Sequence, residues 1–184
     1  PANEGLALSL NAATSKIALD LGLDNFAKVL NKFNFKIPNT INPSISLGAL
    51  ELTPLQLAQA YLIFFFFFLK KEISFIKKVY DQNNKLIWSH QTYENQLFDP
   101  ETITRLNEFL KFNTQMGSAK NIALSQISHN PAGKTGTTND SKDSWFVGFT
   151  DIETAVVWIG DDKNSNTGLT GGSGALPIWI EYFR

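Results

Sequence analysis

The stretch from Ala132 to Ile159 constrains the fold most strongly, because its composition is that of consecutive β-strands. Trp145 to Phe149 and Thr154 to Ile159 are rich in aromatic and β-branched residues, which are enriched in strands. A short acidic turn separates them, as is typical of neighbouring antiparallel strands. The segment around Lys134 precedes them and would supply a third strand. The sequence therefore predicts an antiparallel sheet in this part of the chain.

Apolar residues at helical spacing predict helices elsewhere. Leu6 to Leu21 has the pattern of one helix closed by Gly22. Asp24 is expected to cap a helix to about Phe33, and Thr53-Pro54 to begin a third. The remaining expected elements are a hairpin (Ile73–Tyr80 with Leu86–Trp88), a helix from Asp99-Pro100 to about Lys111, a loop over Asn113–Asn121 and a closing helix over Ala175–Phe183. Helices, then strands, then a helix indicate an α+β domain.

Composition excludes several classes of function. The chain has 184 residues, 43% of them hydrophobic, and a net charge of −1, so we expect a globular domain without a nucleic-acid partner. It has no cysteine, and its two histidines, His90 and His129, are far apart in sequence. These residues therefore give no reason to propose a metal site. The longest apolar run, Tyr61 to Leu69, is much shorter than the roughly 20 residues of a membrane-spanning helix.

Gly133-Lys134-Thr135-Gly136-Thr137-Thr138 combines a cation, three hydroxyls and two glycines. An edge strand can pair with an extended peptide through its backbone, and Gly136 lacks a Cβ, so a ligand backbone can approach closely. The Lys134 ammonium and the hydroxyls of Thr135 and Thr137 can bind a carboxylate. The segment therefore suits an anionic, peptide-like ligand, although Lys-Thr-Gly alone also occurs by chance in surface strands.

A phosphate-binding P-loop is the rival interpretation of Gly133-Lys134-Thr135. That motif requires a glycine five positions before Gly133 and a helix after the lysine. In this chain Ser128 stands where that glycine should be, and a β-rich segment, not a helix, follows the lysine. The P-loop is therefore rejected.

Serine transpeptidases and β-lactamases carry three signatures, S-x-x-K, S-x-N and K-T-G. K-T-G is present at Lys134 within AGKTGTTNDSKDSWFVGFTDIETAVVWIGDD, and S-x-N at Ser9-Leu10-Asn11 within LALSLNAATSKIALDLGL. Both segments resemble the penicillin-binding proteins, especially the bifunctional class A type, and the resemblance extends over nearly the whole chain. A simple helix cap at Ser9 or Asn11 is the alternative for the second motif.

The resemblance implies that residues 1–184 form the C-terminal part of one penicillin-binding transpeptidase domain. Its fold would be α+β, an antiparallel sheet backed by helices, truncated at the N-terminal side. Because the sequence begins without an initiator methionine, we expect a longer parent polypeptide. The parent would work at the periplasmic face of the bacterial inner membrane, and any membrane anchor would lie outside this chain.

The resemblance also implies an activity and a set of roles, and it implies that no metal and no organic cofactor are needed. The parent would cross-link peptidoglycan stem peptides by D,D-transpeptidation through an acyl-serine intermediate, and β-lactams would acylate the same serine. Ser9 would relay a proton, with Lys134 as its electrostatic partner. The substrate would be bound by Asn11, Thr135, Gly136 and Thr137, and the Thr137 N–H would supply half of an oxyanion hole.

The nucleophile motif S-x-x-K is the missing signature. Ser74-Phe75-Ile76-Lys77 matches it in letters, but it follows Ser9, whereas in the family it precedes S-x-N. It also lies in an alternating, strand-like segment, where residues three apart face opposite sides. We therefore expect the nucleophile upstream of Pro1 and this chain alone to be inactive. The alternative is a non-catalytic β-lactam- or peptidoglycan-binding module, or the remnant of a disrupted gene.

Phe64 to Phe68 is the clearest departure from the family. A buried aromatic cluster is one interpretation of this run. We favour an origin in the coding sequence, because five phenylalanine codons imply a T-rich tract that is prone to slippage.

Overall fold

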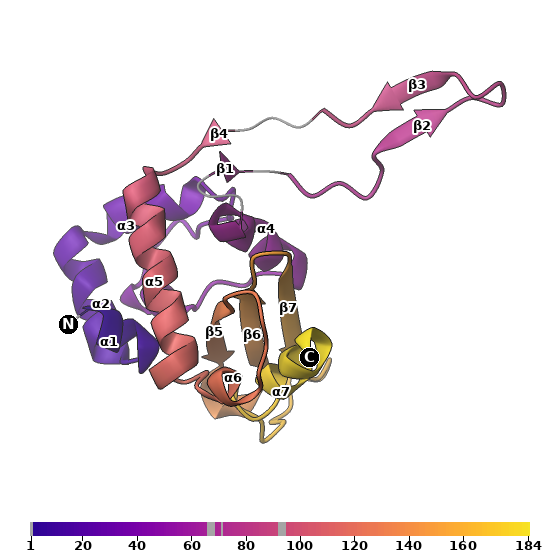
Figure 1. The fold of residues 1–184 in the computed structure, drawn as a ribbon. Coiled ribbons are helices and arrows are strands. Elements are labelled where there is room, and N and C mark those ends of the chain that lie inside the picture. Colours follow the sequence, from indigo (N-terminus) through magenta and orange to yellow (C-terminus); the bar gives the residue numbers. More distant parts are fainter. Residues whose placement is uncertain (1, 66–68, 71, 92–94) are drawn as a thin grey trace.

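The computed structural model describes residues 2–65, 69–70, 72–91 and 95–184. Its helices are α1 (Ala2–Ala7), α2 (Asn11–Leu21), α3 (Leu23–Asn31), η1 (Pro43–Leu47), α4 (Pro54–Phe65), α5 (Pro100–Met116), α6 (Asn121–Leu124), η2 (Asn139–Ser141) and α7 (Ala175–Phe183). Its strands are β1 (Leu69–Lys70), β2 (Lys78–Tyr80), β3 (Leu86–Ser89), β4 (Asn95–Gln96), β5 (Ala132–Thr137), β6 (Ser144–Phe149) and β7 (Thr154–Ile159). Figure 1 shows their arrangement.

The predicted antiparallel sheet is present as β5, β6 and β7, in that spatial order. Lys134 pairs with Val147, and Val147 pairs with Val156 on the other side. β5 is therefore an outer strand of this sheet. Helices pack on the sheet, so the α+β expectation is confirmed.

Successive side chains of β6 bury themselves on opposite faces of the sheet, as strand geometry requires. The ring of Phe146 meets Trp179 of α7 edge to face, with centroids 5.1 Å apart. The ring of Phe149 stacks on Phe64 of α4 at 5.8 Å. The sheet is therefore covered by α7 on one face and by α4 on the other. Phe64 thus has a packing role, whereas residues 66–68 of the phenylalanine run lie outside the described residues.

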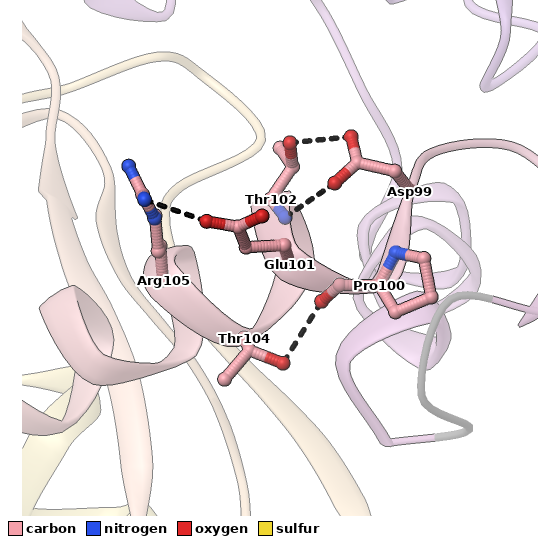
Figure 2. A network of polar contacts seen from close by, with 6 residues as sticks. All are labelled: Asp99, Pro100, Glu101, Thr102, Thr104 and Arg105. Atoms are coloured by element: carbon pink, nitrogen blue, oxygen red, sulfur yellow. Dashed lines mark hydrogen bonds and ion pairs between the residues drawn. The ribbon is translucent and has the colours of Figure 1, made fainter.

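Helix α5 lies between the sheet and the N-terminal helices (Figure 1). Its first turn is fixed by Asp99, whose carboxylate accepts hydrogen bonds from the Thr102 N–H at 2.9 Å and the Thr102 hydroxyl at 2.6 Å (Figure 2). Both hydrogen bonds lower the pKa of Asp99, and the bond from the Thr102 hydroxyl has the larger effect. Glu101 pairs with Arg105 one turn later at 2.6 Å. The predicted start is confirmed, but the predicted end near Lys111 is wrong, because the helix continues to Met116.

The single helix expected over Leu6–Leu21 is wrong. The backbone turns at Ser9, whose φ of 53° is left-handed, and α1 and α2 are separate helices. The Ser9 N–H bonds to Leu6 O, and the Leu10 N–H bonds back to Gly5 O. Together these bonds form a Schellman motif that ends α1.

The other expected elements are shifted rather than absent. Gly22 does end α2, but α3 begins at Leu23, so Asp24 lies in the first turn and is not the cap. Thr53 caps α4 as expected, exchanging hydrogen bonds with Gln56 in a capping box. The hairpin is present as the short antiparallel pair β2–β3. The loop expected over Asn113–Asn121 is instead helical up to Met116.

Candidate active site

Ser9 occupies the position at which a Schellman motif ordinarily has glycine. Its left-handed backbone projects the side chain from the junction of α1 and α2, toward β5. The Ser9 hydroxyl accepts a hydrogen bond from Lys134 Nζ, 125 residues away in sequence. A non-glycine residue in this conformation carries local strain, and such strain is concentrated at functional sites. The predicted contact between Ser9 and Lys134 is therefore present.

Lys134 extends from the middle of β5 into a partly buried environment. Its ammonium group donates to Ser9 Oγ, to Thr135 O at 3.0 Å and, weakly, to Thr135 Oγ1 at 3.5 Å. Burial disfavours the charged form and lowers the pKa of Lys134 to about 8. Lys134 therefore gains and loses its proton at a pH much closer to 7 than an exposed lysine does.

The turn after α5 brings the N-terminal helices to the sheet. The Ser118 N–H donates to Ala7 O at 3.0 Å, and this occupies the carbonyl that would receive the Asn11 N–H in a continuous helix. At Gly117 a Cβ would lie 2.4 Å from Ala7 O, so only glycine permits this approach. This long-range contact accompanies the Schellman motif at the break between α1 and α2, and both hold Ser9 in place.

Asn113 is a site residue that the sequence analysis missed. It is fully buried, and its amide nitrogen donates to Gly133 O at 2.7 Å, while its oxygen accepts from the Ser118 N–H and Ser118 Oγ at 3.0 and 3.1 Å. Asn113 thereby joins α5 and the following turn to the start of β5. A signal was available, since Asn113 continues the apolar face of α5 one turn after Leu110.

The predicted substrate-binding residues differ in their surroundings. Thr135 Oγ1 lies 2.6 Å from Ser118 Oγ. Ser118, like Asn113, was given no role in the sequence analysis. Thr137 Oγ1 accepts from the Gly171 N–H at 2.9 Å, and its own O–H remains able to donate. Gly136 is approached closely by Gly171 of the same chain.

Asn11 is the first residue of α2 and is exposed. Its side chain makes no hydrogen bond to any described residue. The cap of α2 is Leu10, without a side-chain hydrogen bond, so the capping alternative for Ser9 and Asn11 does not apply. The structure thus brings Ser9, Lys134 and Thr135 into one cluster, with Gly136 and Thr137 further along β5, whereas Asn11 makes no hydrogen bond to this cluster of described residues.

Ser74 does not form an S-x-x-K pair. It precedes β2 without belonging to a helix or a strand, so the expected strand-like setting is wrong. Its hydroxyl donates to Ile76 O at 2.8 Å, and no hydrogen bond between Ser74 and Lys77 is present in the described part of the chain. The helical turn that would place Lys77 beside Ser74 is not formed.

Metal-binding clusters and membrane-spanning helices are both missing from the part of the chain that the structure describes. Its residues contain no group of three or more histidine, cysteine, aspartate or glutamate side chains arranged to hold a metal ion. Among the described helices, none combines the length and hydrophobicity needed to cross a membrane.

Comparison with known proteins identifies the family. The sequence matches the family described as "Penicillin binding protein transpeptidase domain" over residues 1–175. Penicillin-binding protein 1B of Vibrio cholerae serotype O1 is 34% identical over 180 residues, which are 97% of this chain and 23% of that protein. The structure of penicillin-binding protein 1A from Haemophilus influenzae superimposes with a TM-score of 0.89 at 25% identity, covering 98% of this chain and 33% of that one.

The fold is shared with a more distant protein as well. The penicillin G acyl-enzyme complex of penicillin-binding protein A from Mycobacterium tuberculosis superimposes with a TM-score of 0.75 at 18% identity, over 98% of this chain and 47% of that one. The chain spans about a quarter of the Vibrio protein and a third of the Haemophilus chain. With the family match over residues 1–175 and these class A relatives, the chain belongs to the penicillin-binding protein transpeptidase family.

Proposed function

We propose that residues 1–184 are the C-terminal part of a D,D-transpeptidase domain that cross-links peptidoglycan stem peptides through an acyl-serine intermediate. The hydrogen bond between Lys134 and Ser9 carries this proposal, because it joins the K-T-G and S-x-N motifs across 125 residues. Family membership and the α+β fold support it.

Ser9 is the proton relay to the leaving amine. Because the Lys134 ammonium donates to Ser9 Oγ, the Ser9 O–H is free to donate to a nitrogen that leaves a tetrahedral intermediate. Lys134 can then restore the Ser9 proton, and its pKa of about 8 makes that transfer easier than from an exposed lysine. Lys134 in the charged form also attracts the carboxylate of the substrate.

The outer strand β5 is the binding edge for the stem peptide. An extended D-alanyl terminus can add to this edge as a further strand. Thr135 and Thr137 would bind its carboxylate, Gly136 would allow its backbone to approach, and Asn11 would hydrogen-bond its amide. The Thr137 N–H would form half of an oxyanion hole, and the N–H of the nucleophilic serine the other half.

The nucleophile belongs, in this proposal, to an S-x-x-K segment that precedes residue 1 in the parent protein. The chain covers only 23% of its Vibrio relative, which leaves ample sequence for such a segment and for a membrane anchor. The parent would act at the periplasmic face of the inner membrane. β-Lactams would acylate the same serine, and the Mycobacterium protein forms an acyl-enzyme complex with one of them, penicillin G.

Labelling with a fluorescent penicillin tests the proposal. A parent protein that includes the upstream S-x-x-K segment should form a covalent adduct, and Ser9→Ala should slow acylation by a factor on the order of 100 or more, as for loss of a general acid–base group. Ser15→Ala, further along α2, is the matched control and should label normally. Equal labelling of Ser9→Ala and the unaltered protein would refute the role of Ser9.

The location of the nucleophile is tested separately. The 184-residue chain alone should form no adduct. An adduct mapped to Ser74 would refute the assignment of the nucleophile to upstream sequence. A parent gene without any upstream S-x-x-K would favour a non-catalytic module instead.

A further inference from the structure

The orientation of the buried Asn113 amide is fixed by two backbone groups. Gly133 O can only accept a hydrogen bond, so the group 2.7 Å from it must be the amide nitrogen. The Ser118 N–H can only donate, so the group 3.0 Å from it must be the amide oxygen. Asn113 Oδ1 is therefore an obligatory acceptor that faces Ser118.

The direction of the next two hydrogen bonds follows from this orientation. Ser118 Oγ lies 3.1 Å from Asn113 Oδ1 and must donate to it. A serine hydroxyl has one proton, so Ser118 Oγ can only accept from Thr135 Oγ1, 2.6 Å away. At the other end, the Lys134 ammonium can only donate to Thr135 Oγ1. The Ser118 end thus requires that the Thr135 proton points to Ser118, and the donation from Lys134 to a lone pair of Thr135 Oγ1 is compatible with that direction.

We propose that Asn113 and Ser118 are positioning residues that hold the Thr135 hydroxyl with its lone pairs, and not its proton, toward the ligand side of β5. The hydrogen bonds run in one direction, from Lys134 through Thr135, Ser118 and Asn113 to Gly133 O. A ligand carboxylate needs a donor, so Thr135 must release Ser118 before it can donate to that carboxylate. The release lowers the affinity of the site for carboxylates. The inference rests on the proposed function only for the identity of this ligand.

The proton positions test the inference independently of any activity. Neutron diffraction from crystals of the 184-residue chain, exchanged into deuterium oxide, should show deuterium on Thr135 Oγ1 directed at Ser118 Oγ. It should also show deuterium on Ser118 Oγ directed at Asn113 Oδ1. Deuterium on Ser118 Oγ directed at Thr135 would overturn the inference, whatever the protein catalyses.

The consequence for ligand binding is tested in the parent protein with penicillin G and its methyl ester, which lacks the carboxylate charge. Ser118→Ala frees the Thr135 proton, so the ratio of the two acylation rates should shift in favour of the acid by roughly two- to tenfold, the value of one hydrogen bond. Ser118→Thr retains the hydroxyl and should keep the original ratio.

The ratio separates positioning from a general structural effect. A merely structural loss in Ser118→Ala would slow both compounds equally and leave the ratio unchanged, and that result would overturn the inference. A fall in the ratio would do the same, because it would mean that Ser118 donates to Thr135. If neither the unaltered protein nor any variant is acylated, the proposed function fails. The neutron result still decides the direction of the hydrogen bonds in that case.

Discussion

Lys134 makes folding stability depend on pH in a direction opposite to that of a salt-bridged lysine. In the unfolded state a lysine has a pKa of about 10.5, whereas burial in the folded state lowers the pKa of Lys134 to about 8. Between these values the unfolded state binds more protons, so the free energy of unfolding should rise with pH. From pH 7 to 9.5 the expected rise is about 2 kcal/mol. Urea denaturation at both pH values measures it.

Lys134→Met is the matched control for this pH effect, since it retains the length of the side chain without a titrating group. Tyr61, whose burial raises its pKa to about 12, titrates with the opposite effect on stability above pH 10 and is present in both proteins. The difference between the unaltered chain and Lys134→Met therefore isolates Lys134. A difference that stays constant from pH 7 to 9.5 would contradict the prediction.

Ser9 combines a strained backbone with a side chain in the candidate site. Ser9→Gly should relieve the left-handed strain, whereas Ser9→Ala retains it, and both lose the hydroxyl. We expect Ser9→Gly to be more stable than Ser9→Ala by about 1 kcal/mol, as measured by chemical denaturation. If the two variants unfold at the same denaturant concentration, the backbone at Ser9 is not strained.

The residues of the site were predictable to different degrees. Lys134 and Ser9 belong to motifs whose letters identify them, and their contact followed from the family resemblance. Asn113 and Ser118 belong to no such motif, and their contribution depends on where α5 ends. The position of polar Asn113 on the apolar face of α5 indicates a buried polar role, but its partner Gly133 is evident only from the fold.

At the scale of elements, the loop before α7 is held on the sheet by Gly171. A Cβ at Gly171 would lie 2.6 Å from both Gly136 O and Trp145 O, and neither backbone atom can move without disturbing β5 or β6. Gly171→Ala should therefore cost about 1–3 kcal/mol, as for overpacking of a core. Thermal or urea denaturation measures the loss.

The neighbouring glycine provides the control for Gly171. A Cβ at Gly172 would meet Ser118 O at 3.6 Å, an ordinary contact, so Gly172→Ala should leave stability nearly unchanged. Equal destabilisation by both substitutions would show that loss of loop flexibility, and not the contact with β5 and β6, is responsible.

Elements that depend on local sequence patterns were predicted better than elements that depend on long-range contacts. β7 and α7 have the predicted bounds, because their apolar patterns are local and uninterrupted. The break at Ser9 was not predicted, and the bond from Ser118 to Ala7 O that accompanies it joins residues far apart in sequence. The last turn of α5 was missed, because buried Asn113 and Thr114 have the composition of a loop.

At the scale of the whole molecule, the packed helices and sheet contrast with the hairpin β2–β3. Figure 1 shows the hairpin projecting away from the remainder. Apolar side chains stay exposed here, Ile87 of β3 by 60% and Phe75 of the segment before β2 by 84%. Large exposed apolar surface is uncommon in a monomer and favours association. The hairpin should therefore contribute to self-association of the chain, and little to its stability.

Replacing residues 74–91 by a short glycine–serine linker tests both expectations. β1 and β4 pair at the base of the hairpin, so a few residues can close the gap. The free energy of unfolding should change by less than about 0.5 kcal/mol, and sedimentation velocity should show less association. Ile103→Ala, a buried position in α5, should lose about 2–5 kcal/mol in the same assay. A comparable loss on hairpin removal would mean that the hairpin stabilises the folded core.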